Sequence, residues 1–188
     1  MAGTNEVLLV RHGETDENAA ARFQGRIDTR LNDRGREQSR ALALEVRDEA
    51  IVALYSSPLL RARETAQFVG EALGLEAVLD ERLVEADAGE WSGRMIADIL
   101  ASEADAYARW RAADPAFRFP GGESVAEQAR RIAAALADVA AGPLPALVVT
   151  HGGTIRAVEA IDVGPTGKVG NCQVFRLDAV IPAPSCPP

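Results

Sequence analysis

Two segments that share one pattern place the strongest constraint on how this chain folds. The first runs from Val7 to Thr15 and the second from Ala146 to Thr154, and in each a short apolar run ends at His-Gly before a helix-forming segment. Apolar, β-branched runs of this kind are typical of buried parallel strands. The pattern therefore predicts an α/β fold with a mostly parallel central sheet and helices on both faces.

The two histidines of the chain lie at the ends of these runs. His12 and His151 are the only histidines in 188 residues, and ligands of open α/β sheets bind beyond the carboxyl ends of the strands. A lone histidine at a strand end is more often structural than catalytic, but two in the same context predict one shared site. Gly13 and Gly152 let backbone N–H groups approach a bound group, beside helix N-termini that favour anions. We therefore expect an anion, with phosphate as the first candidate.

Charge and composition indicate how such a site must be built. The net charge is −8 and the sequence pI is near 4.9, which argues against nucleic acid as a partner. An anion site then needs locally concentrated positive groups. Arg11 adjoins His12, and Arg61 opens a helix after a strand that would end at the same sheet edge if it is parallel. Guanidinium groups match phosphate oxygens. Taken alone, Arg61 is better explained as a surface arginine of a helix, but beside the two histidines we expect it in the site.

Length and composition predict one domain over residues 1–188, because 47% hydrophobic content suffices to bury a full core. The aromatic-bearing stretch from about 91 to 119 predicts a small helical lid over the crevice. The Pro-rich tail, residues 179–188, is expected to be disordered or draped. The other elements expected are a helix from Asn32–Asp33 to about Asp48 with Leu42, Leu44 and Val46 on its inner side, strands at Ile51–Tyr55, Glu76–Leu79 and Cys172–Leu177, and a helix to about Ala140 that begins at the capping box Ser124–Glu127.

Cysteine usage and the lengths of the apolar runs predict the compartment of the protein and the kinds of partner it has. Cys172 and Cys186 form no disulfide framework and no zinc pattern, and no HExxH motif is present. The N-terminus has no signal-peptide pattern, and every apolar run is too short to span a membrane. These features predict a cytoplasmic protein without a metal, a cofactor, a nucleic acid or a membrane partner. Its expected partner is a small phosphorylated substrate, and a homodimer is compatible with the same features.

Five motifs in order resemble one known family. The stretch Leu9–Thr15 with Asn18 is similar to the signature of the histidine phosphatase superfamily, in its phosphoglycerate-mutase-like branch. The resemblance continues through most of residues 5 to 177, on the following positions: Phe23–Gln24–Gly25, Asp28, Leu31 and Gly35; Ser57–Ala66; Leu83, Glu85, Gly89, Trp91 and Gly93; Pro120–Ser124; and His151–Gly153 with Arg156, followed by Asn171–Cys172.

The resemblance implies a role for each site residue. His12 would attack phosphorus to give a phosphohistidine, and Arg11 and Arg61 would help to keep it neutral. Glu85 would protonate the leaving oxygen and later deprotonate a water. The transferred phosphoryl group would be held by Arg11, Asn18, Gln24, Gly25, Arg61, His151 and Gly152.

Several alternatives stay open at the level of sequence. Spacing does not separate Glu85 from its neighbours Asp87 and Glu90, and only the motif match selects Glu85. A metal-independent phosphomonoester hydrolase is the preferred function. A cofactor-dependent phosphoglycerate mutase would use the same residues, and a pseudo-enzyme would bind phosphorylated ligands without turnover. The segment 161–170 is also shorter than the resemblance leads us to expect.

Overall fold

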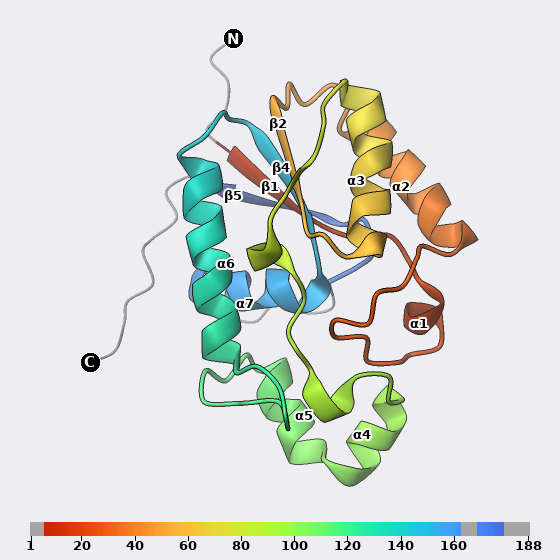
Figure 1. Cartoon of the computed structure of the whole chain (residues 1–188), viewed down its shortest axis with the longest axis vertical. Coiled ribbons are helices and arrows are strands. Elements are labelled where there is room, and N and C mark those ends of the chain that lie inside the picture. Colours follow the sequence, from red (N-terminus) through yellow and green to blue (C-terminus); the bar gives the residue numbers. More distant parts are fainter. Residues whose placement is uncertain (1–5, 163–168, 179–188) are drawn as a thin grey trace.

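A five-stranded sheet forms the centre of the molecule (Figure 1). The computed structural model describes residues 6–162 and 169–178, so the tail 179–188 and most of the short segment after residue 161 lie outside it. The strands are β1 (Glu6–Arg11), β2 (Ala53–Ser56), β3 (Val78–Leu79), β4 (Ala146–Thr150) and β5 (Val174–Asp178), in the order β3-β2-β4-β1-β5. Only β5 is antiparallel to its neighbour, so the expected mostly parallel α/β sheet is confirmed.

The helices begin and end close to the expected positions. They are α1 (Asp16–Ala19), α2 (Asp33–Glu45), α3 (Leu60–Leu73), α4 (Ile96–Ser102), α5 (Ala104–Arg111), α6 (Val125–Ala140) and α7 (Gly152–Asp162), with short 3₁₀ turns η1 (Glu81–Leu83) and η2 (Gly89–Trp91). The capping box at Ser124 is confirmed, and Asn32 caps α2. The inner side expected for α2 was wrong at Leu44, which is 65% exposed. An α-helix turns 100° per residue, so Leu44 points away from the buried Leu42 and Val46.

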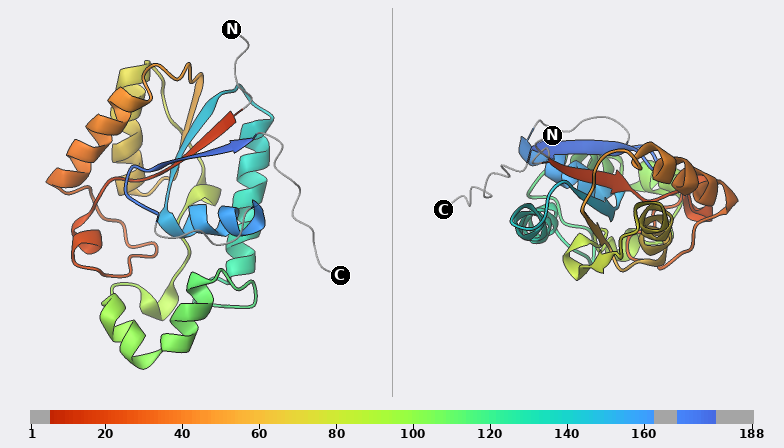
Figure 2. Two further views of the ribbon diagram at one scale, coloured as in Figure 1. Left: turned by 180° about the vertical axis from the view of Figure 1, so that it is seen from behind. Right: turned by 90° about the horizontal axis from the view of Figure 1, so that it is seen from above.

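Alternation along the central strands divides the core into two layers. Val7 and Leu9 of β1 face one layer, which includes side chains of α6 and α7, and Leu8 and Val10 face the other, which includes side chains of α2 and α3. Successive side chains of a strand point to opposite faces, so a strand that is apolar throughout can serve both layers. The views in Figures 1 and 2 show these helices around the sheet. The expected helices on both faces are confirmed.

The register of β1 and β4 brings the two His-Gly segments together. Arg11 pairs with Thr150, and the backbone N–H of His12 donates to the Thr150 carbonyl at 3.0 Å. β2 is parallel to β4, so Arg61 also begins its helix at this edge. Three parallel strands thus deliver their carboxyl ends to one place, as the sequence predicts.

The lid formed by α4 and α5 lies beyond the carboxyl ends of these strands, at the lower end of the molecule in Figure 1. Its two connections to the body run side by side, because Glu90 N–H donates to the Pro120 carbonyl and Glu123 N–H donates to the Asp87 carbonyl, both at 2.9 Å. Gly89 makes this close approach feasible: its φ is +49°, and a Cβ there would overlap the Pro120 carbonyl oxygen.

A separate apolar cluster packs the lid against the loop after β1. Its centre is Trp91, which is fully buried and contacts Phe23, Phe117 and Phe119 with ring centroids 5.4 to 5.6 Å apart. Aromatic rings at such separations stabilise one another beyond their burial alone. In the described part of the chain, no helix has the length and apolar character needed to cross a membrane.

Candidate active site

A pocket of about 540 Å³ lies between the carboxyl edge of the sheet and the lid. Eight of the nine site residues expected from the sequence line it: Arg11, His12, Asn18, Gln24, Gly25, Arg61, Glu85 and Gly152. The ninth, His151, is fully buried directly behind His12, with the two ring centroids 5.2 Å apart. The structure therefore brings the whole expected set to one place.

His12 is oriented so that one ring nitrogen faces the pocket arginines. Its Nδ1 lies 2.7 Å from the Gly13 carbonyl oxygen, and Nε2 accepts a hydrogen bond from Nε of Arg61 at 3.2 Å. Because a carbonyl only accepts hydrogen bonds, Nδ1 carries the proton of the neutral ring. Nε2 therefore holds the lone pair, and it is the nitrogen available for attack on an electrophile.

His151 is held by Ser57, the residue that follows β2. Its Nε2 lies 2.8 Å from the Ser57 hydroxyl, whereas its buried Nδ1 has no hydrogen-bond partner in the described residues. Nε of Arg11 is likewise buried without a partner there. Buried polar atoms are ordinarily satisfied, so these two unpaired atoms mark the place where an anion would be held.

The two expected arginines are fixed in different ways. Arg61 is 1% exposed and donates from Nη1 to the Ile27 carbonyl at 2.7 Å and from Nη2 to the Gly25 carbonyl at 2.8 Å. Arg11 donates from Nη1 to the Val169 carbonyl at 2.6 Å. Because their bonds to backbone carbonyls orient both groups, they present positive charge to the pocket without moving.

The electrostatics keep both imidazoles neutral. Burial, followed by the charges of Arg61 and Arg11, holds the pKa of His12 well below its usual range, and burial and Arg61 do the same for the pKa of His151. The sequence predicted the effect of the arginines, but burial is the larger cause. Burial also lowers the pKa of Arg61 to about 10, which leaves its guanidinium charged at neutral pH.

Glu85 and Glu14 are the two carboxylates among the described residues that line this pocket, and Glu14 Oε1 accepts from Nδ2 of Asn32 at 3.1 Å. The Oε2 of Glu85 accepts from Gly153 N–H at 2.9 Å, and its Oε1 accepts from Ala86 N–H at 2.9 Å and from Nε2 of Gln128 at 3.1 Å. A Cβ on residue 153 would overlap the carboxylate, which explains the glycine at that position. Among the residues around the pocket neither Asp87 nor Glu90 appears, so position favours Glu85 over both alternatives.

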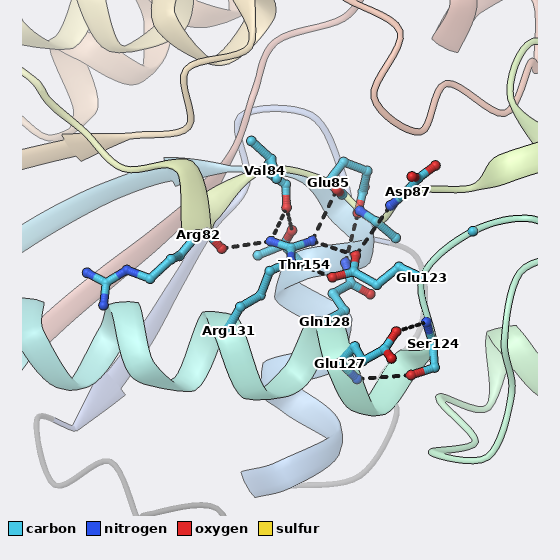
Figure 3. A network of polar contacts seen from close by, with 12 residues as sticks. Arg82, Val84, Glu85, Asp87, Glu123, Ser124, Glu127, Gln128, Arg131 and Thr154 are labelled. Atoms are coloured by element: carbon cyan, nitrogen blue, oxygen red, sulfur yellow. Dashed lines mark hydrogen bonds and ion pairs between the residues drawn. The ribbon is translucent and has the colours of Figure 1, made fainter.

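The backbone that carries Glu85 is tied to helix α6 through Arg131 (Figure 3). Arg131 donates from Nη1 to the carbonyls of Arg82 and Val84, both at 2.7 Å, and from Nη2 to the Glu85 carbonyl at 3.1 Å. Glu123 pairs with the same guanidinium at 2.7 and 2.9 Å. This network fixes the loop of Glu85 to the core helix rather than to the lid helices.

The loop after β1 closes the side of the pocket. Asn18 Oδ1 accepts from Nδ2 of Asn171 at 3.2 Å, and Gln24 Oε1 accepts from the Thr29 hydroxyl at 2.9 Å. The expectation for Gly13 was wrong, because its N–H donates to the Thr65 hydroxyl at 3.0 Å and is not directed to a ligand.

Some residues of the site were not singled out from the sequence. Ser57 appeared only within a matched motif and could have been singled out, since it follows a parallel strand at the same edge. Gln128 interrupts the apolar face of α6 between Val125 and Ile132, and a buried amide there signals a polar partner. Asn171 and Arg156 appeared only as motif matches. Among residues 6–162 and 169–178, no cluster of three His, Cys, Asp or Glu side chains is arranged to hold a metal ion.

The fold and the site define an α/β protein in which histidines and arginines gather in one pocket at the carboxyl ends of the parallel strands. The model of the histidine phosphatase superfamily (branch 1) matches residues 7–170. The chain belongs to this superfamily.

Relatives within the family carry different names. Phosphoserine phosphatase 1 of Hydrogenobacter thermophilus is 36% identical over 134 residues, which cover 71% of this chain and 64% of that protein. Probable phosphoglycerate mutase GpmB of Photorhabdus laumondii is 35% identical over 185 residues, which cover 92% of this chain and 84% of that protein. A structure of mycobacterial glucosyl-3-phosphoglycerate phosphatase with VO3 superimposes with a TM-score of 0.84 at 33% identity, covering 91% of this chain and 90% of that one.

Proposed function

We propose that this protein is a metal-independent phosphomonoester hydrolase that acts through a phosphohistidine at His12 on a small phosphorylated metabolite. The observation that carries the proposal is the orientation of His12, whose Nδ1–H is used by the Gly13 carbonyl while Nε2 faces Arg61 in the pocket. A neutral imidazole with its lone pair beside a guanidinium is suited to attack a phosphoryl group held by that guanidinium.

The first half-reaction transfers the phosphoryl group to the protein. Nε2 of His12 forms a bond to phosphorus as the bond between phosphorus and the ester oxygen breaks, and Glu85 in its protonated form gives its proton to that oxygen. Arg11 and Arg61 hold the equatorial oxygens, where negative charge spreads in the transition state. The buried Nδ1 of His151 and Nε of Arg11 have no hydrogen-bond partner in the described residues, and in the proposed mechanism both donate to the same oxygens.

The second half-reaction returns the enzyme to its starting state. Water attacks the phosphohistidine, Glu85 takes its proton, and the bond between phosphorus and Nε2 breaks to release inorganic phosphate. Glu85 regains in this step the proton that it gave up in the first. The three donors on its carboxylate keep it in position for both transfers.

A phosphoglycerate mutase is the second candidate, because several relatives of similar identity bear that name. A mutase must shield its phosphohistidine from water while the bound intermediate reorients to accept the phosphoryl group at its other oxygen. About 27 residues separate Gly93 from Gly121 in this chain, and they form a short cover over the pocket for an enzyme that must exclude water. This favours hydrolysis over transfer back to the substrate. The presence of His12, Arg61 and Glu85 in one pocket also counts against a pseudo-enzyme.

One experiment separates these functions. The protein is given 3-phosphoglycerate with a bisphosphoglycerate primer, and 2-phosphoglycerate and free phosphate are followed together. We expect free phosphate to form faster than the isomer, in the presence of EDTA. With a substrate that carries a labelled phosphoryl group, the label bound to the enzyme should be lost in acid and retained in base, as expected for a phosphoramidate. His12→Ala should carry no label.

Three results would contradict the proposal. Isomer that forms much faster than phosphate would establish the mutase. A label stable in acid but labile in base would indicate a carboxylate or hydroxyl nucleophile. Complete loss of activity with EDTA, restored by one divalent ion, would indicate a metal-dependent phosphatase.

A further inference from the structure

The pocket has a second cationic end, away from the strand ends. Arg156 of α7 and Arg111 at the end of α5 line the same pocket as His12 and Arg61. Arg156 is 7% exposed, and its guanidinium carbon lies 4.6 Å from the centre of the Trp110 ring. This end of the pocket, formed by α7 and the lid helix α5 and called the lid end below, thus presents positive charge that the proposed phosphoryl transfer does not use.

Arg156 lacks partners that a buried guanidinium ordinarily has. Its Nε and Nη1 are buried without a hydrogen-bond partner in the described chain. Burial, and then the like charge of Arg111, lowers the pKa of Arg156. The nearby carboxylate of Glu85 already accepts three hydrogen bonds. A cation held in this way without a close counter-charge is stabilised by an anion that enters from the pocket.

A neighbouring arginine shows the contrast on the same helix. Arg109 of α5 points to solvent and pairs with Asp114 at 2.7 Å. Arg111 instead lines the pocket and adds its charge to that of Arg156. Two like charges that line one pocket disfavour each other unless a negative group lies between them.

The backbone of Arg156 lies close to the strand-end region along α7. It follows Gly152 by four residues on α7, which is about one helical turn or ~5–6 Å along the axis. Gly152 lies against Arg11, since a Cβ there would be 3.3 Å from Nε of Arg11. Because Arg156 and His12 also line one pocket, we expect a single small substrate to reach both.

We infer that Arg156 and Arg111 form a subsite for a carboxylate of the substrate, so that the substrates are phosphate esters of small hydroxy acids or amino acids. This inference rests on the proposed function. A planar guanidinium pairs with a carboxylate through two parallel hydrogen bonds. A carboxylate also carries one negative charge, which suits an end with one buried guanidinium, whereas the strand-end site offers two arginines and two histidines.

The test compares two ligands that differ in the carboxylate alone. In 3-phosphoglycerate and glycerol 3-phosphate the phosphate and the three-carbon skeleton are the same, and a hydroxymethyl group replaces the carboxylate in the second. Calorimetric titration of His12→Ala with each ligand measures binding without turnover. We expect 3-phosphoglycerate to bind at least about tenfold more tightly, since hydrogen bonds between charged groups are worth roughly that factor.

Variants assign the preference to the subsite. In the His12→Ala background, Arg156→Met and Arg111→Gln should each reduce the ratio of the two dissociation constants to below about threefold. Arg109→Gln, on the same helix as Arg111, is the matched control and should leave the ratio unchanged. Because Arg111 is only half buried, its variant keeps the inference testable if Arg156→Met fails to fold. The ratio of kcat/KM for the two esters, measured with His12 present, should change in parallel.

The outcomes distinguish this inference from the proposed function. Equal binding of the two ligands, or a preference that survives both variants, overturns the carboxylate subsite even if the phosphoenzyme forms. A larger gain for fructose 1,6-bisphosphate over fructose 6-phosphate, lost in Arg156→Met, would replace the carboxylate with a second phosphoryl group and also overturn it. If no ester is hydrolysed but the binding ratio and its loss in the variants are found, the proposed function fails and the subsite stands.

Discussion

Arg61 and Arg156 are both buried in the same pocket, yet they are held in opposite ways. Arg61 donates hydrogen bonds to His12, to the Gly25 carbonyl and to the Ile27 carbonyl. Arg156 is held by Trp110 and leaves two of its nitrogens without a hydrogen-bond partner in the described residues. A fully oriented group stabilises developing charge without moving, whereas an incompletely satisfied one gains most when a ligand completes it. This contrast is the basis of our proposals that the strand-end region performs the chemistry and that the end of the pocket at Arg156 selects the substrate.

The largest effect should come from the strand-end arginine. Arg61→Lys keeps a positive charge but loses the geometry that serves His12 and two carbonyls. We expect kcat/KM to fall about 10²- to 10³-fold for every phosphate ester, whatever group follows the ester oxygen, because one oriented donor to the transition state is removed. Arg63→Lys, on the exposed side of the same helix, is the matched control. A loss of activity confined to one class of ester would contradict the proposal that Arg61 serves the chemical step and not the choice of substrate.

The second effect distinguishes proton transfer from positioning at Glu85. Glu85→Gln should lower kcat about 10²-fold or more for alkyl phosphates and much less for nitrophenyl phosphate, whose leaving oxygen hardly needs a proton. Asp87→Asn is the control, since Asp87 accepts from Gly89 N–H instead of lining the pocket. Equal losses on both kinds of ester would make Glu85 structural and would return attention to Asp87 and Glu90.

The third effect concerns the stability of the strand-end region and needs no substrate. Both histidines have a folded-state pKa below the unfolded value of about 6.5. The unfolded chain therefore binds more protons, and the free energy of unfolding should decrease as the pH falls below about 6.5, by up to ~1.4 kcal/mol per pH unit for each histidine. Urea denaturation between pH 8 and 5 measures this slope, and His151→Asn should reduce it by about half, since it removes one of the two groups. A flat profile would show that the imidazoles are not held neutral.

The smallest effect is expected at the lid end. Trp110→Leu removes the ring on which Arg156 rests, and we expect KM for a carboxylate-bearing ester to rise about 3- to 10-fold with kcat nearly unchanged, because cation–π contacts are worth that much. Leu100→Ala, at an exposed position of α4, serves as the control. A fall in kcat with KM unchanged would show that Trp110 supports the chemical step, and would contradict the proposed difference between the two ends of the pocket.

The strand-end region could be predicted from the sequence because its information is local. Each of His12 and His151 follows a recognisable strand, and parallel strands must deliver their ends to one edge. The same reasoning placed Arg61, and the motif match selected Glu85 from three acidic residues. The error at Leu44 arose because hydrophobicity was counted without its helical angle.

The lid end could not be predicted in the same way. Arg156 contacts the Trp110 ring only because α7 lies near α5, and forty residues separate these two helices in the sequence. No spacing in the sequence encodes such a contact. Burial of the histidines, which dominates their pKa values, is likewise a property of the assembled layers. The aromatic content of the stretch predicted a lid but not which of its side chains meets the pocket.

The adjacency of the two lid connections has a consequence for how such proteins diverge. Backbone hydrogen bonds join Glu90 to Pro120 and Glu123 to Asp87. The chain therefore enters and leaves the lid at neighbouring positions, as an inserted segment of a domain does. Insertions, deletions or wholesale replacement between these points change the chain that covers the pocket and leave the framework of Glu85 and Arg131 intact. A lineage can thus acquire new substrates by exchanging one contiguous stretch of sequence, and a protein engineer can graft a foreign lid at the same two positions.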